Sequence, residues 1–408
     1  MHIGPGILDG VRVLDLTRVV AGPSGTRVLA DLGADVVKIE PPEGDILRGG
    51  APRKGGIAVL FAGQNAGKRF CSVDLGRPEG VALVLDLAER CDVVCENFRP
   101  GVADRLGVGY EHVRARRPDV VYASVSGYGQ DGRDAQRRAY APVVHAEVGL
   151  LHYKAREVGH DPAPEPVSHA DIAAGMAAAQ GILAALFRRE RTGQGAHIDA
   201  SMCEAMIAMN EWTTVEVNGG PDYVNSPFRP GRAPVVQLGD GTWVALPGSP
   251  AAVLEAVANL WGRPDILADE RFATLQARSA RLDECTELIA EYAATFDDFE
   301  TFESTLSNGA RLPVGRLATM ADTVSTGWAV DRHAYVEVPS GDEADDATVV
   351  VHRSPLRITG ADCGPRRGVK HLGADNREVM AELLGLDDAE IDRLEAAGIL
   401  VSARIPAS

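Results

Sequence analysis

One aspartate stands directly before a run of small residues and is the first candidate for chemistry in this chain. The segment SHADIAAGM (168–176) places Asp171 before Ile172, two alanines and Gly175. A carboxylate at the start of a helix can act as an N-cap, because its oxygen accepts a backbone N–H that has no partner within the helix. It can also act as a nucleophile or a base, since the helix dipole favours negative charge there. The two roles are compatible, and both are kept open.

The residues after Asp171 predict the helix that carries it. Apolar side chains recur at intervals of three and four between Ile172 and Leu186, which is the helical period. We therefore expect a helix over residues 171–188.

The first part of the chain alternates between strand-like and helix-like segments. Apolar runs predict strands at 11–17, 34–40, 92–98 and 119–129, and helical patterns at 21–33, 79–91 and near 109–116. This alternation predicts a parallel sheet with helices on both faces. Ligands of such sheets bind beyond the carboxyl ends of the strands. The segments of interest are therefore those that follow three of these strands, namely 17–23, 96–101 and 126–132.

Phosphate-binding fingerprints are missing from these segments. The first predicted strand is followed by AGPSG rather than by GxGxxG, and the sequence contains no GxxxxGK[ST]. Dinucleotide binding of the usual kind and Walker-type nucleotide binding are therefore not expected.

The second half changes in character. A short strand AHIDA precedes a helix at 200–216, and residues 217–234 are rich in Gly, Pro and Asn, which is typical of a linker. VVQLGDGTWVALPGS then predicts a hairpin, and residues 250–325 are mostly helical and acidic. Residues 334–359 alternate like strands, and 377–400 form an amphipathic helix interrupted at Gly385.

Bulk composition limits the classes of function. The 408 residues suggest two domains, and a net charge of -17 argues against nucleic acid as a partner. No apolar run is expected to reach the roughly 18 residues that span a membrane, and the first residues lack a secretory signal. The six cysteines form no CxxC pair, which favours buried thiols over a metal site and a reducing, cytoplasmic location. Local basic residues still allow a polyanionic ligand; they are Arg18, Lys38, Arg48, Lys68, Arg69, Arg99, Arg105, Arg137 and Arg138.

The order of the motifs resembles that of one family over nearly the whole chain. They are VRVLDLTRVVAGP, LGADVVKIEPPEGD, NAGKRFCSVDL, DVVCENFRPGVADRLGVGYE, YASVSGYGQDG, the Asp171 segment, RRERTGQGAHIDASM, LPVGRLATMADT and ELLGLDDAEIDRLEAAGI. This sequence is similar to the class III CoA-transferases, the family of formyl-CoA transferase and carnitine-CoA transferase, which includes the alpha-methylacyl-CoA racemases.

The resemblance implies an α/β fold in an interlocked homodimer. A large Rossmann-like, CoA-binding domain would be built from both chain ends, residues 1–216 and 331–408, with a smaller α+β domain and linker inserted at 217–330.

The resemblance also implies the reaction. Asp171 matches the covalent nucleophile of the transferases, which forms an aspartyl-CoA thioester while CoA passes from an acyl-CoA to a carboxylic acid. Such exchange uses CoA as substrate and needs no metal and no permanently bound cofactor. It needs small neighbours that admit a bulky thioester, and residues 172–175 meet that need. By match to the family, the CoA-contacting residues are Arg18, Val19, Val20, Val73, Asn97, Phe98, Arg105, Leu106, Arg138 and Tyr140.

Some positions depart from the transferase pattern. Ala141 follows Tyr140 where relatives often have an acid, Val20 and Leu60 replace a glutamine and a tyrosine of formyl-CoA transferase, and PFRPGRAPVV (227–236) replaces its GGGGQ lid. These changes indicate a less polar pocket and a larger or more apolar acyl group.

Two other functions stay open. A racemase would need a base on each face of the substrate, and Tyr140 stands where such enzymes have a histidine; His145 and His169 are the nearby alternatives. A non-catalytic acyl-CoA-binding relative is the third possibility, although the intact Asp171 segment argues against it.

Overall fold

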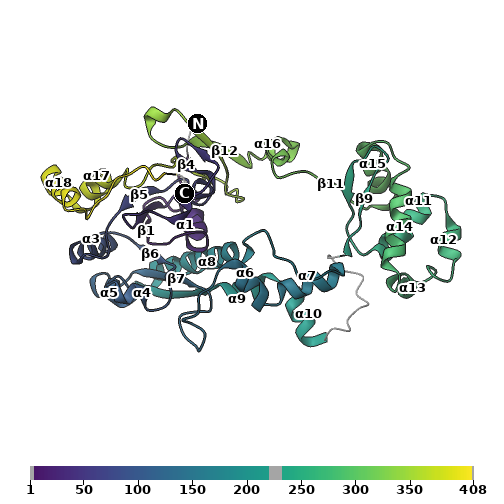
Figure 1. The fold of residues 1–408 in the computed structure, drawn as a ribbon, viewed down its shortest axis with the longest axis horizontal. Helices are drawn as coiled ribbons and strands as arrows, with labels where there is room; N and C mark the ends of the chain where they lie inside the picture. Colours follow the sequence, from purple (N-terminus) through teal and green to yellow (C-terminus); the bar gives the residue numbers. More distant parts are fainter. Residues whose placement is uncertain (1–3, 220–231, 407–408) are drawn as a thin grey trace. The chain divides into compact units, whose positions relative to one another are not determined.

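The structure, a computed structural model, describes residues 4–219 and 232–406, and it divides the chain into two compact units (Figure 1). The first unit comprises residues 1–148, 165–210 and 327–408, and the second comprises 149–164 and 211–326. Both ends of the chain thus belong to the first unit. The division differs from the limits expected at 217 and 330 mainly by the segment 149–164, which the sequence pattern did not separate from its surroundings.

The first unit contains a parallel six-stranded sheet. Its strands, in spatial order, are β5 (Arg69–Ser72), β2 (Asp35–Glu40), β1 (Arg12–Asp15), β6 (Val93–Glu96), β7 (Val121–Ser126) and β8 (Ala196–Ser201). The predicted parallel sheet is confirmed. β5 was missed, because Arg69 and Ser72 leave only Phe70 and Cys71 as apolar residues within it. The strand order reverses between β1 and β6, so the loops that follow these two neighbours lead in opposite directions and leave a crevice.

Helices cover both faces of this sheet. α1 (Ala21–Asp31) and α8 (His169–Thr192) pack on one face, and α3 (Pro78–Glu89) and α5 (Tyr110–Arg116) pack on the other. Successive strand residues alternate between the two cores; Val13 joins the α1 and α8 core, whereas Leu14 joins the other. Burial on both sides explains why the strands are apolar throughout rather than alternating.

The small residues after Asp171 permit a close approach of two helices. A Cβ on Gly175 would lie 2.0 Å from Ser24 Oγ and 2.5 Å from the carbonyl oxygen of Ala21, and a Cβ on Gly25 would lie 2.6 Å from the carbonyl oxygen of Gly175. Gly175 is therefore required for the contact between α8 and α1. The expectation that this residue makes room for a thioester is wrong, since α1 fills that space.

Helix α8 corrects the statement that no apolar run is long enough to cross a membrane. By length and composition alone, His169–Thr192 would be long and apolar enough. Half of its most apolar window is buried, and it packs against α1, β7 and β8. It is thus the core helix of the first unit.

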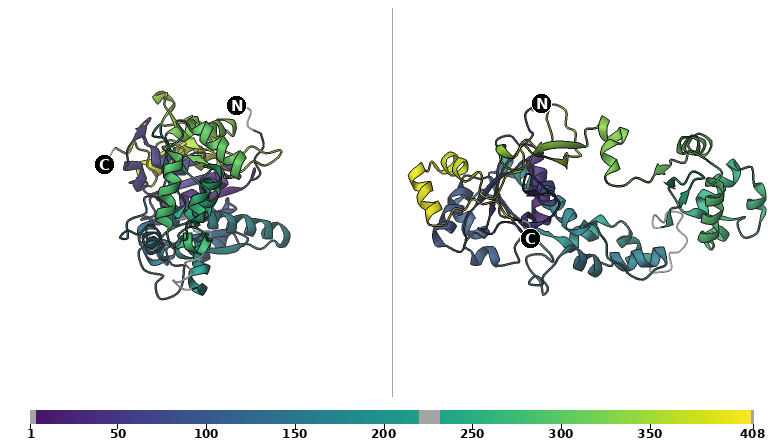
Figure 2. Two further views of the ribbon diagram at one scale, coloured as in Figure 1. Left: turned by 90° about the vertical axis from the view of Figure 1, so that its right-hand side faces the viewer. Right: turned by 45° about the horizontal axis from the view of Figure 1, so that its top comes forward.

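Residues from the far end of the chain complete this unit. α17 (Asn376–Val379), a π-helical turn (Met380–Leu384) and α18 (Asp388–Ala396) bring Met380, Leu394 and Leu400 into the core beside Leu14 and Val37. In Figure 1 and in the right panel of Figure 2 the C-terminal segment, in yellow, lies beside the N-terminal part, in purple and blue. The interruption predicted at Gly385 is confirmed, since that residue ends the π-helical turn with φ +70.

Short elements complete the first unit. They are a 3₁₀ turn (Ile46–Gly49), β3 (Arg53–Lys54), β4 (Ile57–Ala58), α2 (Val59–Asn65), α4 (Val102–Arg105), α6 (Ala141–Glu147), α9 (Met202–Met209), α16 (Gly327–Asp331), β12 (Tyr335–Pro339) and β13 (Thr348–His352). β12 and β13 pair antiparallel, as the alternation at 334–359 predicts.

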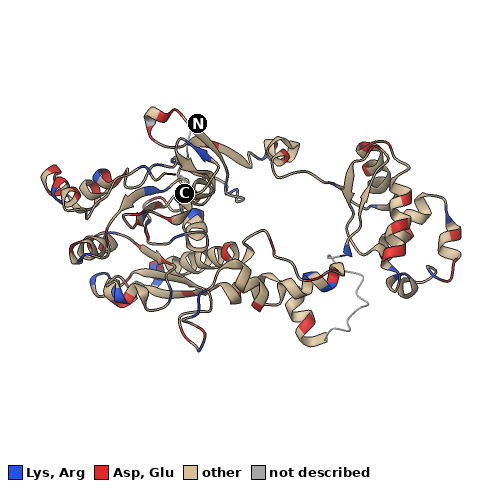
Figure 3. Cartoon of the chain, in the orientation of Figure 1, with Lys and Arg blue, Asp and Glu red and all other residues tan. Residues whose placement is uncertain are grey.

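The second unit has its own core. β9 (Val235–Gln237) and β10 (Trp243–Ala245) form the predicted hairpin, and β11 (Gly315–Arg316) extends it. The helices are α7 (Leu150–Val158), α10 (Trp212–Gly219), α11 (Pro250–Leu260), α12 (Pro264–Ala268), α13 (Leu275–Ser279), α14 (Leu282–Ala293) and α15 (Phe299–Ala310). Acidic side chains are frequent along several of them (Figure 3). The predicted linker at 217–234, and with it the first part of PFRPGRAPVV, lies largely outside the described residues.

Candidate active site

Two adjoining cavities lie in the first unit, where the strand order reverses. The larger, of about 420 Å³, includes side chains from the three segments that the sequence marked, 17–23, 96–101 and 126–132. The smaller, of about 260 Å³, is lined by residues after β2 and β5, including Pro41, Pro42 and Leu75. Arg18, Phe98 and Val102 line both. The prediction that a site forms beyond the carboxyl ends of the strands is therefore supported by a cavity at that place.

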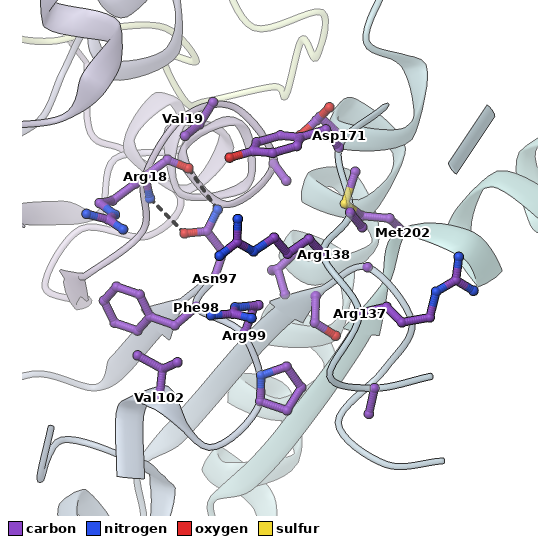
Figure 4. A pocket seen from close by; sticks show the side chains of 18 residues that line it. Arg18, Val19, Asn97, Phe98, Arg99, Val102, Arg137, Arg138, Asp171 and Met202 are labelled. Carbon is purple, nitrogen blue, oxygen red and sulfur yellow. Dashed lines mark hydrogen bonds between the residues drawn. The ribbon is translucent and has the colours of Figure 1, made fainter. Parts of the chain in front are cut away.

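The loop between β1 and α1 forms one wall of the larger cavity. Asn97 fixes the main chain of this loop, because its Oδ1 accepts the Arg18 N–H at 2.7 Å and its Nδ2 donates to the Arg18 carbonyl at 2.8 Å (Figure 4). Val19 has φ +67, an unfavourable conformation for a β-branched residue. Its N–H donates to Asp45 at 3.0 Å. The surroundings thus hold this loop in a strained shape beside the cavity.

A buried polar network holds the main chain at the start of the loop between β1 and α1. Asp15 and Lys68, both completely buried, form an ion pair of 2.9 Å. Asp15 also accepts the Thr17 N–H at 3.0 Å, and Lys38 donates to the Thr17 carbonyl at 2.7 Å. Burial by itself would raise the pKa of Asp15, but Lys68, Lys38 and the hydrogen bond from Thr17 lower it to about 2. This carboxylate stays charged and fully partnered.

Glu96 shapes the neighbouring corner after β6. Its Oε2 accepts the Phe98 N–H at 2.7 Å, so the side chain sets the turn that presents Asn97 and Phe98 to the cavities. Burial raises the pKa of Glu96 to about 7, and the hydrogen bonds from Ser124 and from Phe98 only partly oppose this shift.

Asp171 lies in the first turn of α8 and lines the larger cavity (Figure 4). It is not the N-cap, because that position is Ser168, so the capping role considered from the sequence is wrong. Burial raises the pKa of Asp171 to about 6, although backbone hydrogen bonds from Asp171 itself, Ala21 and Ala141 act in the opposite direction. Ala21 and Ala141 are the first residues of α1 and α6. The carboxyl is therefore surrounded by the amino ends of three helices, which favour negative charge.

Arginines provide positive charge along the larger cavity. Arg18, Arg99 and Arg138 line the larger cavity, and within the described residues none of them forms an ion pair. Arg137 also lines it but is paired with Glu147 and Asp134. Figure 4 shows Arg138 extending into the middle of the cavity and Arg137 extending away. Three unpaired guanidinium groups beside an apolar slot can bind a ligand that carries phosphates and a flat ring.

Most residues matched to the family surround the two cavities. Asp171, Val19, Asn97, Arg138 and Tyr140 line the larger one, Val73 and Leu106 line the smaller one, and Arg18 and Phe98 line both. Val20 precedes α1 and lines neither cavity, and Arg105 is an exposed residue at the end of α4 that also lines neither. The structure does not bring these two residues to the site.

The three residues from which a less polar pocket was expected also lie outside the two cavities. Val20, Leu60 and Ala141 are absent from the lining of both cavities. Leu60 is exposed, and Ala141 is buried with its amide toward Asp171. The expectation of a larger or more apolar acyl group therefore has no support from these side chains.

The two histidines near Asp171 differ in their surroundings. His145 is completely buried, and its Nε2 accepts the Ala170 N–H at 3.2 Å. His169 is half-buried, with its Nε2 3.7 Å from Glu165. Neither lines the cavities, whereas Tyr140 does.

One cluster in the described part of the chain has metal-ligand geometry. Single ligand atoms of Asp342, Asp345 and His371 lie within 4.8 Å of one another. Arg404 already pairs with both carboxylates, at 2.7 Å and 3.2 Å. These residues line neither of the two cavities, and we interpret the cluster as an ion-pair network.

Sequence reasoning missed several lining residues. Val125 and Ser126 end β7, Gly127 follows it, and Met202 begins α9. The first three fall within or next to a marked segment, so their place on the strand end was a usable signal. Met202 and Ala139 carry no chemical signature, and only the fold brings them to the cavity.

Comparisons with known proteins agree on one family. The family model for CoA-transferase family III matches residues 8–376. Formyl-CoA:oxalate CoA-transferase of Streptomyces avermitilis is 32% identical over 96% of this chain and 99% of its own length. Succinyl-CoA–D-citramalate CoA-transferase of Chloroflexus aurantiacus is 31% identical over 97% and 98%.

Solved structures give the same result. A CaiB/BaiF family protein from Brucella suis is 30% identical, with a TM-score of 0.76 over 93% of this chain and 100% of its own. Rv3272 from M. tuberculosis is 29% identical, with a TM-score of 0.75 over 92% and 99%.

Proposed function

This chain belongs to CoA-transferase family III, and we propose that it moves CoA from an acyl-CoA to a carboxylic acid through an aspartyl-CoA thioester on Asp171. The observation that carries the proposal is the position of the Asp171 carboxyl. It lines a cavity, it is half-buried, and it accepts hydrogen bonds from three backbone amides, with no ion pair among the described residues.

The first half-reaction transfers CoA to the protein. The Asp171 carboxylate attacks the thioester carbonyl of the donor and expels CoA thiolate, which leaves a mixed anhydride. The thiolate then attacks the side-chain carbonyl of Asp171 and releases the first acid as a carboxylate. The product is an aspartyl-CoA thioester, and no electrons or protons are gained or lost.

The second half-reaction is the reverse with another acid. The acceptor carboxylate attacks the aspartyl thioester and expels CoA thiolate, which leaves a new mixed anhydride. The thiolate attacks the acyl carbonyl of the acceptor, so the acceptor leaves as a CoA thioester and Asp171 returns to its carboxylate.

Local electrostatics support these steps. A pKa of about 6 leaves Asp171 ionised at neutral pH and makes it more basic than an ordinary aspartate. The amides of Ala21 and Ala141 point at the same carboxyl, so they can stabilise negative charge that develops on its oxygens when the thiolate adds to the side-chain carbonyl.

The paired cavities suit CoA. The smaller one offers Pro41, Leu75, Phe98 and Leu106 as apolar walls for the adenine ring. Arg18 lies at the junction, with its guanidinium 5.7 Å from the centre of the Phe98 ring, and Arg99 and Arg138 follow along the larger cavity. In this placement the phosphates meet the arginines, and the pantetheine arm leads toward Asp171.

The racemase alternative gains no support from a specific side chain. His145 is buried and its Nε2 already accepts a backbone N–H, and His169 lies outside the lining of the cavity. Tyr140 lines the cavity, but an ordinary tyrosine is a weak base near neutral pH.

We also propose that two copies associate. Apolar side chains are exposed in the first unit; they are Leu60, Met176, Phe187, Ile207 and Met209 on helices, and Tyr140 directly before α6. Association of two copies would cover such side chains. Light scattering is expected to give the mass of two chains, and a monomer at micromolar concentration would contradict the proposal.

The central test is mass spectrometry of the Asp171 peptide. The protein is mixed with formyl-CoA, succinyl-CoA and longer acyl-CoAs, quenched in acid, and searched for a CoA adduct on the peptide that carries Asp171. We expect an adduct with at least one donor, none with Asp171→Asn, and a loss of transferase activity of roughly 10³-fold or more in that variant. His112→Gln, an exposed change on α5, is the control. An adduct on another residue, or α-deuterium incorporation from heavy water without any adduct, would contradict the mechanism.

A further inference from the structure

The amino end of α8 lacks the cap that its own sequence would supply. Ser168 is at the N-cap position, and its side chain makes no capping hydrogen bond. The first amides of a helix have no partner within it, so they need one from outside. The amide of Ala170 is one of these, and Ala170 directly precedes Asp171.

His145 supplies that missing partner from another helix. Its ring is completely buried on α6, and its Nε2 accepts the Ala170 N–H at 3.2 Å. Helix N-caps accept the amide of the second or third helical residue, and Ala170 is the second residue of α8. His145 therefore does for α8 what Ser168 does not.

The same short helix touches the Asp171 turn twice. The amide of Ala141, the first residue of α6, acts on the Asp171 carboxyl, and His145 binds the amide one residue before it. α6 thus fixes both the main chain and the side chain of the first turn of α8.

This bond requires a neutral ring. Nε2 can accept only if it carries a lone pair, so the ring proton must lie on Nδ1. A protonated ring would face the Ala170 N–H with a second N–H, and both donors would be left buried without a partner. Burial lowers the pKa of His145, and so does His169, whose ring centre is 6.0 Å away, whereas Glu165 acts in the opposite direction. Burial and His169 thus favour the neutral ring that the bond needs, while its Nδ1 has no hydrogen-bond partner among the described residues.

We propose that His145 is a positioning residue for Asp171, which as a neutral cap on the first turn of α8 holds the carboxyl in the orientation that attacks the thioester. The inference rests on the proposed function for its kinetic consequence, but the capping bond itself is testable without any substrate.

The first measurement is amide hydrogen exchange of the peptide that covers residues 168–176. In His145→Leu we expect exchange in this peptide to be roughly five-fold faster, the effect of losing a typical helix cap. In His145→Gln the amide oxygen can still accept, so protection is expected to return to within about two-fold of the wild type. His112→Gln is the matched control. Equal protection in His145→Leu and the wild type would overturn the capping role.

The second measurement separates positioning from chemistry. With a donor that forms the adduct in the wild type, kcat is expected to fall roughly ten-fold in His145→Leu and to recover in His145→Gln, while KM changes little. As the pH is lowered, kcat of the wild type is expected to fall more steeply than kcat of His145→Gln. In the wild type both His145 and Asp171 must be deprotonated for activity, whereas in the variant only Asp171 must be.

The outcomes also distinguish the two proposals. If the wild type forms no adduct with any donor but the exchange results hold, the cap stands and the transferase mechanism fails. If the adduct forms and kcat falls equally in both variants without a change in exchange, His145 acts on the substrate and the positioning role is overturned.

Discussion

Two carboxylates in the first unit have opposite environments. Asp15 ends β1, is completely buried, and is paired with Lys68. Asp171 lies in the first turn of α8, is half-buried, and accepts hydrogen bonds from backbone amides, with no ion pair among the described residues. Burial would raise the pKa of both groups, yet that of Asp15 is held at about 2 and that of Asp171 rises to about 6. The presence of a cation accounts for the difference.

The difference separates a structural acid from a reactive one. A carboxylate that is paired with an ammonium group and hydrogen-bonded by hydroxyls loses basicity and supports the main chain around it. A carboxylate that is partly desolvated and held only by dipoles keeps its negative charge near neutral pH and remains available to an electrophile.

The largest expected change in stability comes from removing the cation that pairs with Asp15. Lys68→Met leaves a buried carboxylate without its partner, so we expect the free energy of unfolding to fall by about 3–5 kcal/mol. Urea unfolding measures the change. Asp15→Asn combined with Lys68→Met is expected to lose less than the sum of the single changes, because no charge is then left unpaired.

A matched surface change provides the control for this experiment. Arg114→Met removes an exposed ion pair with Glu111 on α5, and we expect no measurable change in the urea midpoint. Equal losses in Lys68→Met and Arg114→Met would show that the Asp15 pair has no structural role.

The pH dependence of stability should differ in sign between the two carboxylates. The folded pKa of Asp171 lies above the value of 3.8 for an unperturbed aspartate, so its ionised form lowers stability above about pH 6 and has no effect below about pH 4. We expect Asp171→Asn to be more stable than the wild type by about 1–2 kcal/mol at pH 7.5, allowing for partial solvent screening.

The same substitution at Asp15 provides the opposite case. Its folded pKa lies below 3.8, so its ionised form contributes stability above about pH 4, which is lost as the pH falls through about 2. Asp15→Asn is therefore expected to destabilise the protein at pH 7.5. Thermal melts of both variants at pH 4 and 7.5 test the pair; the same sign for both at pH 7.5 would contradict the assignment.

The smallest expected effect concerns the loop between β1 and α1, which contains Val19. Glycine adopts the φ of +67 at Val19 without strain, but it also has a more flexible unfolded state. We therefore expect Val19→Gly to change the free energy of unfolding by less than about 1 kcal/mol, while kcat falls because the loop is less ordered. Unchanged kcat would indicate that the loop conformation does not orient the substrate.

The sequence predicted those parts of the fold that depend on local pattern. Apolar runs and a helical period placed β1, β2, β6, β7 and α8, because their apolar residues are consecutive or recur at a helical spacing. The pattern missed β5, whose four residues begin with a buried arginine, and it did not separate α7 from the first unit. Both depend on which distant segments lie next to them.

The candidate site divides in the same way. The strand ends stood out because polar or glycine residues follow apolar strands, and Asp171 stood out because it precedes a run of small residues and matches the family's nucleophile. The amide partners of Asp171 did not, since any residue has an N–H and only the packing of α1 and α6 brings those of Ala21 and Ala141 to the carboxyl. Gly175 was misread for the same reason, because a small residue admits a helix as readily as a ligand.

The completion of the first unit by the end of the chain has a consequence for biosynthesis. Leu400 bridges to Val73 beside β5, and Met380 and Leu394 fill the core against β1 and β2. As the chain leaves the ribosome, the early strands must wait for these late residues with one apolar face uncovered, while most of the second unit is already synthesised and has its own core. A nascent chain that stalls within its last 30 or so residues would therefore expose an apolar face of the sheet. Chaperones would bind such a chain, or proteases would degrade it.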